Sequence, residues 1–212
     1  MKKLFIIAAA LTIAAPLAAN AAAPDYNYLD LSYSKTTTDG FAGGKGYQFD
    51  GSYGFSENWF VAGGYGHNSF NGGSLTGGFF TSDLTLTVGG HLALTDSVDL
   101  VGRVGYAEDH WKQGPSTNLF PGFTVSTSDS QDGYDLGVGI RAMVIDQLEL
   151  NVFIDHDNVG LLSHDHNKSE SVATVGALYS FTSNFGLGAS YARSNVDSTG
   201  NWMLTGRWYF QP

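Results

Sequence analysis

Hydrophobic and polar residues alternate along most of the chain. Leu92 and Leu94 alternate with small or polar residues, the turn Thr95-Asp96-Ser97 follows, and Val98, Leu100, Val104 and Tyr106 alternate again. A period of two on both sides of a short turn predicts an antiparallel hairpin. The pattern recurs around Ser56-Glu57-Asn58, Asp146-Gln147 and Thr182-Ser183-Asn184. Four short turns separated by longer Gly- and Ser-rich connections are typical of a bacterial outer-membrane β-barrel.

The alternation predicts an all-β fold, a transmembrane antiparallel up-and-down β-barrel with ten strands, or eight as the alternative. Each predicted strand is close to the roughly 9 to 11 residues that a tilted strand needs to cross a bilayer. An even number places both termini on the short-turn side, which faces the periplasm in this class. The predicted strands are Tyr26 to Ser34, Tyr47 to Phe55, Trp59 to His67, Asp83 to Leu94, Val98 to Tyr106, Gly133 to Met143, Leu148 to His156, Ser171 to Phe181, Phe185 to Arg193 and Asn201 to Phe210.

One phase of the alternation is apolar in all ten segments and contains no Asp, Glu, Lys, Arg or His. A charge at mid-bilayer costs about 2–4 kcal/mol, so this phase is predicted to face lipid. Its aromatic residues form two belts, as expected at two membrane interfaces, whereas a soluble sandwich would have no reason to separate them. The predicted girdle comprises Tyr33, Tyr47, Tyr65, Tyr106, Tyr134, Tyr191 and Trp202 beside the long loops, and Tyr53, Trp59, Tyr179, Trp208 and Phe210 beside the short turns.

The opposite phase is polar and is predicted to line the lumen. We expect Arg141 beside Asp99 and Glu149, Arg103 near Asp135, and Arg207 facing Asp30, because an unpaired buried charge is costly. Small barrels are mostly filled by their own side chains, which favours a closed lumen; the alternative is a narrow cation-preferring pathway. The predicted charge network is Asp30, Asp50, Asp99, Arg103, Asp135, Arg141, Glu149, Asp155 and Arg207.

The first 21 residues have the features of a cleaved secretory signal peptide. Two lysines precede an apolar run, and Ala19-Asn20-Ala21 supplies a small-residue cleavage site. The run is too short for a membrane anchor, which needs about 20 apolar residues. Cleavage after Ala21 is favoured over cleavage after Ala23, since Pro24 follows the latter. Residues 22–212 then form one barrel domain.

Composition narrows the possible functions. Charged residues make up 14% of the chain, as do aromatic residues, whereas soluble domains average about 25% charged. Without the leader's two lysines, eight basic residues face twenty acidic ones, a net charge of −12. Nucleic acid is therefore an unexpected partner. The absence of cysteine excludes disulfides and thiolate sites. No metal or other cofactor is predicted.

Several segments resemble a known family. They are Tyr26-Asn27-Tyr28, Asp99 to Tyr106, Gly133-Tyr134, Gly139-Ile140-Arg141, Asn184 to Leu187 and Trp208-Tyr209-Phe210. The chain resembles the small ten-stranded outer-membrane barrels of proteobacteria, including diffusible-signal-related outer-membrane proteins, and more distantly the OmpA and OmpX type. The resemblance implies recognition by the barrel assembly machinery through the C-terminal strand, although Gln211 and Pro212 follow the aromatic ending. It supplies no shared catalytic residues.

Acid–histidine clusters at the rim suggest another function, that of a protease similar to the omptins in which His is a general base. Neighbouring residues on a strand point to opposite faces, so Asp155 and His156 cannot share one site. No catalytic residue is therefore predicted, and two loop histidines do not make a metal site. The clusters are Glu108-Asp109-His110, Asp155-His156-Asp157 and His164-Asp165-His166.

The third long loop, Ala107 to Gln131, is predicted to contain an apolar cluster of Trp111, Phe120 and Phe123. Such a cluster can mark an interaction surface or a loop folded over the barrel mouth. We expect a non-enzymatic outer-membrane protein with a structural or surface-interaction role. Its partners are outer-membrane lipid and lipopolysaccharide, with any extracellular ligand unknown. A narrow porin is the first alternative and a rim protease the second.

Overall fold

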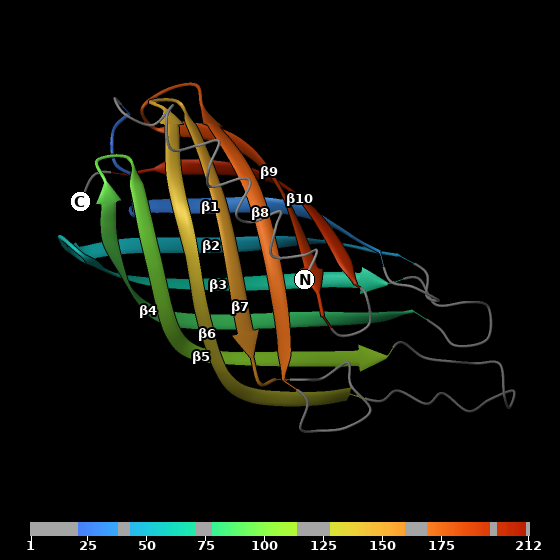
Figure 1. The fold of residues 1–212 in the computed structure, drawn as a ribbon. Coiled ribbons are helices and arrows are strands. Elements are labelled where there is room, and N and C mark those ends of the chain that lie inside the picture. Colours follow the sequence, from blue (N-terminus) through green and yellow to red (C-terminus); the bar gives the residue numbers. More distant parts are fainter. Residues whose placement is uncertain are drawn as a thin grey trace, which may run out of the picture.

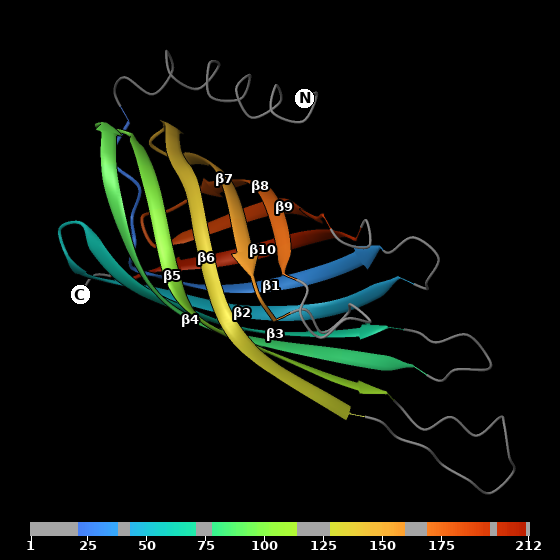
Figure 2. The same ribbon diagram turned by 60° about the horizontal axis from the view of Figure 1, so that its bottom comes forward.

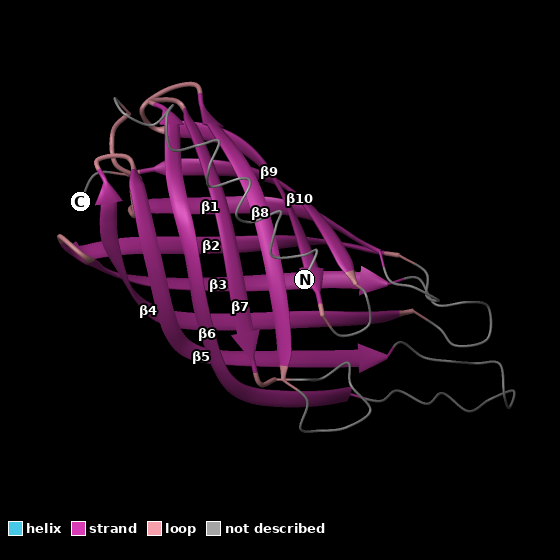
Figure 3. Ribbon diagram, in the orientation of Figure 1, coloured by secondary structure: helices cyan, strands magenta, loops and turns pink. Residues whose placement is uncertain are grey.

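The computed structural model describes residues 21–37, 43–70, 78–113, 128–159, 169–195 and 199–210. In these ranges the chain forms ten β-strands and no helix (Figure 3). The described residues therefore include no helix that is long and apolar enough to cross a membrane. The predicted all-β fold with ten strands is confirmed. The strands are β1 (Tyr28–Thr37), β2 (Gly44–Ser56), β3 (Trp59–Phe70), β4 (Phe79–Thr95), β5 (Val98–Gln113), β6 (Ser128–Ile145), β7 (Leu148–Asp157), β8 (Glu170–Ser180), β9 (Phe185–Ser194) and β10 (Gly200–Tyr209).

The sheet closes on itself into a barrel. Each strand runs antiparallel to its neighbours in sequence, and β1 pairs with β10 from Tyr28 opposite Tyr209 to Thr37 opposite Gly200 (Figure 1). Closure leaves no free sheet edge, which a bilayer requires because lipid offers no hydrogen-bond partners. The four predicted short turns join β2 to β3, β4 to β5, β6 to β7 and β8 to β9. The start of β1 and the end of β10 lie at this same end.

Side-chain exposure follows the predicted alternation. Leu31 and Leu92 are 63% and 62% exposed, while Ser34 and Thr87, in the opposite phase, are buried. The outer wall is therefore apolar and the interior polar, the reverse of a soluble protein. Val98 departs from this pattern, because it is buried against Ala142 on the neighbouring strand, with Ile140 packed beside them.

Strands β4, β5 and β6 exceed their predicted lengths by the most. The predicted boundaries at Tyr106 and Gly133 are wrong, because β5 continues to Gln113 and β6 begins at Ser128. With 17, 16 and 18 residues, β4, β5 and β6 exceed the 10 residues of β7. Figure 2 shows them sweeping past the loop-side end of β7. The seven residues of β5 beyond Tyr106 rise about 20 Å at roughly 3.3 Å per residue. The barrel therefore carries an extension on one side.

Two further predictions concern the beginning of the chain. Strand β1 begins at Tyr28 rather than Tyr26, and Tyr26, which precedes it, hydrogen-bonds to Asp99 on β5. The predicted signal peptide, residues 1–21, lies outside the described residues except for Ala21. It stays a prediction.

Candidate functional site in the lumen and at the loop-side rim

The turn-side half of the lumen holds a network of arginine and carboxylate side chains. They come from β6 and β7 and from β1 and β10, the two strands that close the barrel. The guanidinium of Arg141 on β6 donates two hydrogen bonds to Glu149 on β7, both 2.8 Å. On β10, Arg207 donates two to Asp30 on β1, at 2.8 and 2.7 Å. A nitrogen of Arg207 is also 3.7 Å from a Glu149 oxygen. Glu149 is 2% exposed. The network links β1, β10, β7 and β6 across the interior.

Aromatic faces cover the remaining sides of both arginines. Nη1 of Arg141 and of Arg207 has no hydrogen-bond partner. The Arg207 guanidinium lies 3.8 Å from the ring centroid of Tyr28, and that of Arg141 lies 4.5 Å from the centroid of Tyr26. Stacking on an aromatic face stabilises a cation where water is excluded. The sequence prediction omitted both rings, although the position of Tyr28 in the polar phase is a signal that could have revealed it.

Tyr26 lies across the turn-side end of the lumen. Its hydroxyl donates a 2.8 Å hydrogen bond to Asp99. Its ring stacks on His91 at 4.2 Å and on Phe60 at 5.0 Å between centroids, and it packs with Phe60 and Val101 as a buried cluster. Asp99, expected beside Arg141, is opposite it in register but instead contacts Tyr26 and lies 3.1 Å from His91. This end of the barrel is filled.

Arg103 lies further toward the loops. It was expected near Asp135, whose oxygen is 3.7 Å away, but its shorter contact is with Asp155 on β7, at 2.7 Å. Gly137 on β6 makes room for this pair: a Cβ there would meet both Arg103 and Asp155. The remaining predicted lumen residue, Asp50, accepts a 2.9 Å hydrogen bond from Gln48 and is opposite Asp30.

The loop-side mouth of the lumen is acidic. Asp83 and Asp109 are directly opposite each other on β4 and β5, and Asp157 and Glu170 are opposite on β7 and β8. Asp109 lies beyond Tyr106, on the loop side of the aromatic belt. Burial, and to a smaller extent the charges of Asp83, Asp157 and Glu170, raise the pKa of Asp109 to about 8. Acids that close together disfavour one another's ionised form. The described residues contain no group of three or more His, Cys, Asp or Glu arranged to hold a metal ion.

Each rim histidine faces away from the acid next to it in the sequence. Asp155 points inward to Arg103, whereas His156 shares a 2.9 Å hydrogen bond with Ser171 on the outer phase. His110 is exposed on the outer phase of β5, and Asp109 faces inward opposite Asp83. The Glu108-Asp109-His110 cluster, predicted to begin a loop, lies on β5. His164-Asp165-His166 lies outside the described residues.

The extension carries an aromatic cluster on the continuation of its lumen-facing side. The rings of Phe70 on β3 and Phe79 on β4 stack at 4.5 Å, and Trp111 on β5 lies 6.3 Å from Phe79. Phe70 is buried and lies over Gly44. Trp111, predicted in a loop, is therefore on a strand. Phe120 and Phe123 lie outside the described residues.

Comparison with known proteins identifies the family. Residues 5–160 match the model of the outer membrane protein beta-barrel domain. The chain belongs to this family. As an outer membrane β-barrel, the protein is located in the bacterial outer membrane, as predicted. No curated protein matches it.

Solved outer-membrane barrels are similar to the chain, and the NanC porin shares its fold. The NanC porin is 10% identical, with 86% of this chain and 100% of that chain covered and a TM-score of 0.53. Neisserial surface protein A is 12% identical, with 87% and 96% covered and a TM-score of 0.46. Ail of Yersinia pestis is 19% identical, with 87% and 97% covered and a TM-score of 0.43. At these identities the likeness concerns the fold alone.

The predicted girdle residues lie toward the two ends of the barrel wall, and their role at the two membrane interfaces stays a prediction. On the loop side they form cross-strand pairs, Tyr33 with Tyr47, Tyr106 with Tyr134 and Tyr191 with Trp202. Most are exposed, and Tyr191 and Phe210 are partly buried. Tyr65, Tyr53, Trp59, Tyr179 and Trp208 are all at least 43% exposed.

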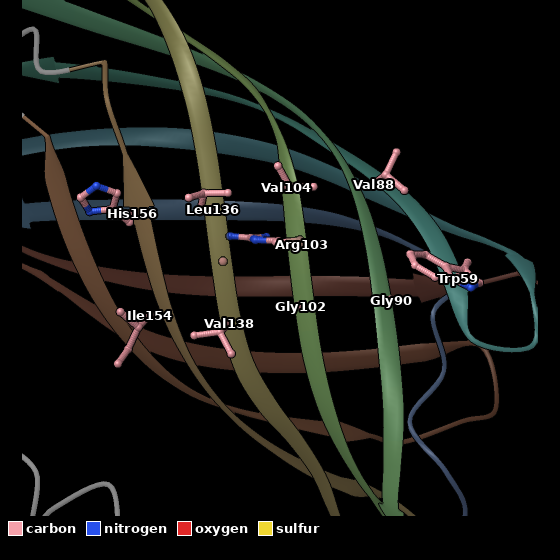
Figure 4. A pocket seen from close by; sticks show the side chains of 11 residues that line it. Trp59, Val88, Gly90, Gly102, Arg103, Val104, Leu136, Val138, Ile154 and His156 are labelled. Atoms are coloured by element: carbon pink, nitrogen blue, oxygen red, sulfur yellow. The ribbon is translucent and has the colours of Figure 1, made fainter.

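A groove of about 460 Å³ crosses the outer wall of the barrel (Figure 4). Gly90 and Gly102, opposite each other on β4 and β5, form its floor, and Trp59, Val104 and Val138 line it. A Cβ on Gly102 would meet nothing within 4 Å. Its apolar lining matches the hydrocarbon that surrounds the wall in a bilayer.

Proposed function

We propose that this barrel does not conduct and that it acts at the cell surface, where the extension of β4–β6 and the adjoining loops contact other molecules. The observation that carries the proposal is the asymmetry of the two ends. The turn-side lumen is filled by Tyr26 and the Arg141–Glu149–Arg207 network, while β4–β6 rise beyond the tyrosine belt.

The filled lumen supports a non-conducting barrel. Ions crossing the turn-side end would have to pass Tyr26, which is 7% exposed, and Asp99, which is 2% exposed. Asp99 contacts His91 on β4, and the ring of Tyr26 stacks against the guanidinium of Arg141 on β6. Filling of this kind is usual in barrels of small strand number.

The extension supports a surface role, because it adds an ordered sheet where a minimal barrel needs only loops. Its aromatic cluster of Phe70, Phe79 and Trp111 joins three strands. Phe70 is buried, while Phe79 and Trp111 stay partly exposed, and aromatic side chains are enriched at contact surfaces. A non-enzymatic role is supported by the rim geometry, in which the outward His110 and His156 are separated from the inward acids Asp109 and Asp155.

Cell adhesion tests this role. A strain lacking the protein would express the natural chain or the Phe79→Ser/Trp111→Ser variant, and its retention on polystyrene, on glass and on a layer of its own cells would be measured. We expect the natural chain to raise retention and the variant to lose most of the gain. The control is Val138→Ala on the lipid-facing wall. Equal retention with and without the protein on all three surfaces would refute a surface-contact role.

The narrow-porin alternative has one observation in its favour, the acidic mouth formed by Asp83, Asp109, Asp157 and Glu170. Acid rings favour cations in channels. The alternative requires the Tyr26 layer to open, and electrical recording separates the two functions.

A further inference from the structure

Basic residues on the outer surface are confined to one end of the barrel. Of the eight Lys and Arg that follow residue 21, three are arginines inside the lumen and one, Lys168, lies outside the described residues. The other four lie at the loop-side end and are exposed. The turn-side surface carries exposed acids instead. The four exposed basic residues are Lys35, Lys45, Lys112 and Arg193, and the turn-side acids are Asp25, Glu57, Asp96 and Asp146.

Two of the lysines are directly opposite each other. Lys35 on β1 pairs in register with Lys45 on β2, one outward step beyond the pair Tyr33 and Tyr47. Opposite residues in an antiparallel sheet have their Cβ atoms about 5 Å apart, and like charges at that separation repel. Among the described residues, no carboxylate lies within ion-pair distance of either lysine; the ion pairs found there all lie in the lumen. The arrangement suits an anion held between the two amines.

The same patch contains a ring and a third cation. Trp202 on β10 is opposite Lys35 and is 58% exposed. Arg193 on β9 is opposite Gly200, two residues from Trp202, and is also exposed. Figure 1 shows β9, β10, β1 and β2 as neighbours in the wall. We call Lys35, Lys45, Arg193 and Trp202 the basic rim patch. Its three basic residues lie just beyond the loop-side aromatic belt, to which Trp202 belongs, and all four are in the outward phase of their strands.

The opposite wall shows the reverse charge at the equivalent position. Beyond the pair Tyr106 and Tyr134, the next outward pair is Glu108 and Asp132. Glu108 already accepts hydrogen bonds from the Tyr106 hydroxyl at 3.3 Å and the Ser130 hydroxyl at 3.2 Å. Among the described residues, the outward positions just beyond the tyrosine pairs are thus basic on the side of β1 and β2 and acidic on the side of β5 and β6.

We propose that the basic rim patch binds a phosphate group of lipopolysaccharide in the outer leaflet. The loop-side end of a barrel of this family faces that leaflet, whose lipid carries phosphates on its sugar headgroup just above the acyl chains. The two lysines would share one phosphate, Arg193 would supply a further donor, and Trp202 would lie beside the sugar at the interface. The absence of exposed lysine and arginine from the described turn-side surface supports a partner on one side of the membrane only.

Native mass spectrometry of the refolded protein in a non-ionic detergent tests the proposal by counting bound lipid A, which retains the headgroup phosphates without the outer sugars. Each lysine near an anionic lipid surface contributes roughly 1 kcal/mol, about a fivefold factor. We therefore expect Lys35→Gln/Lys45→Gln to weaken binding about 25-fold, by the product of two such factors. Lipid A from which the phosphates have been removed is expected to bind the natural chain and this variant equally weakly.

Matched variants separate the site from net charge and from folding. Lys35→Arg/Lys45→Arg keeps both charges and is expected to bind. Lys112→Gln removes an outward lysine that lies about 20 Å beyond Tyr106, at roughly 3.3 Å per residue, and is expected to have no effect. Heat-modifiable gel migration verifies that each variant is folded. Four results would overturn the proposal: undiminished binding by Lys35→Gln/Lys45→Gln, equal loss in Lys112→Gln, equal binding of dephosphorylated lipid A, or equal binding of phosphatidylglycerol by the natural chain.

Discussion

Replacing Glu149 by Gln removes the charge that joins the two turn-side arginines. The carboxylate is 2% exposed, accepts two 2.8 Å hydrogen bonds from Arg141, and lies 3.7 Å from Arg207. Removing one partner of a buried ion pair costs about 3–5 kcal/mol, because the other charge stays buried and unpaired. The ratio of unfolded to folded protein should therefore rise by roughly two to four powers of ten.

Urea unfolding of the refolded protein in phosphatidylcholine vesicles measures this loss, followed by tryptophan fluorescence and by gel migration without boiling. The control is Asp96→Asn, which removes an exposed turn carboxylate and should change stability by less than about 0.5 kcal/mol. The double variant Arg141→Met/Glu149→Leu removes both partners and should be less costly than Glu149→Gln. A loss below about 1 kcal/mol in Glu149→Gln would show that the network does not hold the barrel closed.

Two further predictions address the wall and the mouth. In Gly137→Ala the new Cβ would meet Arg103 inside the barrel, so the free energy of unfolding should decrease by about 1–3 kcal/mol. In Gly102→Ala the new Cβ meets nothing within 4 Å, so no measurable decrease is expected. Equal urea midpoints for the two variants would contradict the faces assigned to these glycines. Asp109 has its pKa raised to about 8, so the folded state binds its proton more tightly than the unfolded state, where the pKa is about 3.9. The contribution of Asp109 to the free energy of unfolding is therefore fully present below the unfolded-state pKa of about 3.9 and is lost as the pH rises to about 8. The urea concentration at the unfolding midpoint should decrease as the pH is raised from about 5 to about 8.5, and this decrease should be smaller in Asp109→Asn. An equal decrease in the variant would refute the raised pKa of Asp109.

The alternation of the sequence was sufficient for the strand number and for the two faces, because lipid outside and side chains inside impose opposite chemistry on successive residues. Beyond Tyr106 this constraint ends, since no bilayer contacts β5 there. The polar residues Glu108 to Gln113 continue the hydrogen-bonded ladder without an apolar phase to reveal it. The strand ends at Gln113 and Ser128 were therefore out of reach of periodicity.

Direct register alone did not decide which expected ion pairs form. Arg207 and Asp30 are opposite each other and form the expected contact. The expected pair of Arg141 and Glu149 also forms, although the two residues are not directly opposite. Arg141 and Asp99 are opposite but do not pair, because Tyr26, which precedes the first strand, binds Asp99. A residue that lies outside a strand has no register, so alternation could not place it. The roles of the individual lumen and girdle residues stay predictions for the experiments above.

Electrical recording in planar bilayers tests the closed lumen most directly. The refolded natural chain should give no discrete conductance steps across a wide range of voltages, and Tyr26→Gly/Phe60→Ala, which empties the turn-side layer, should give steps with cation preference, since Asp83 and Asp109 lie in the same lumen. Reproducible steps from the natural chain, with the same size in this variant, would contradict a lumen closed by Tyr26.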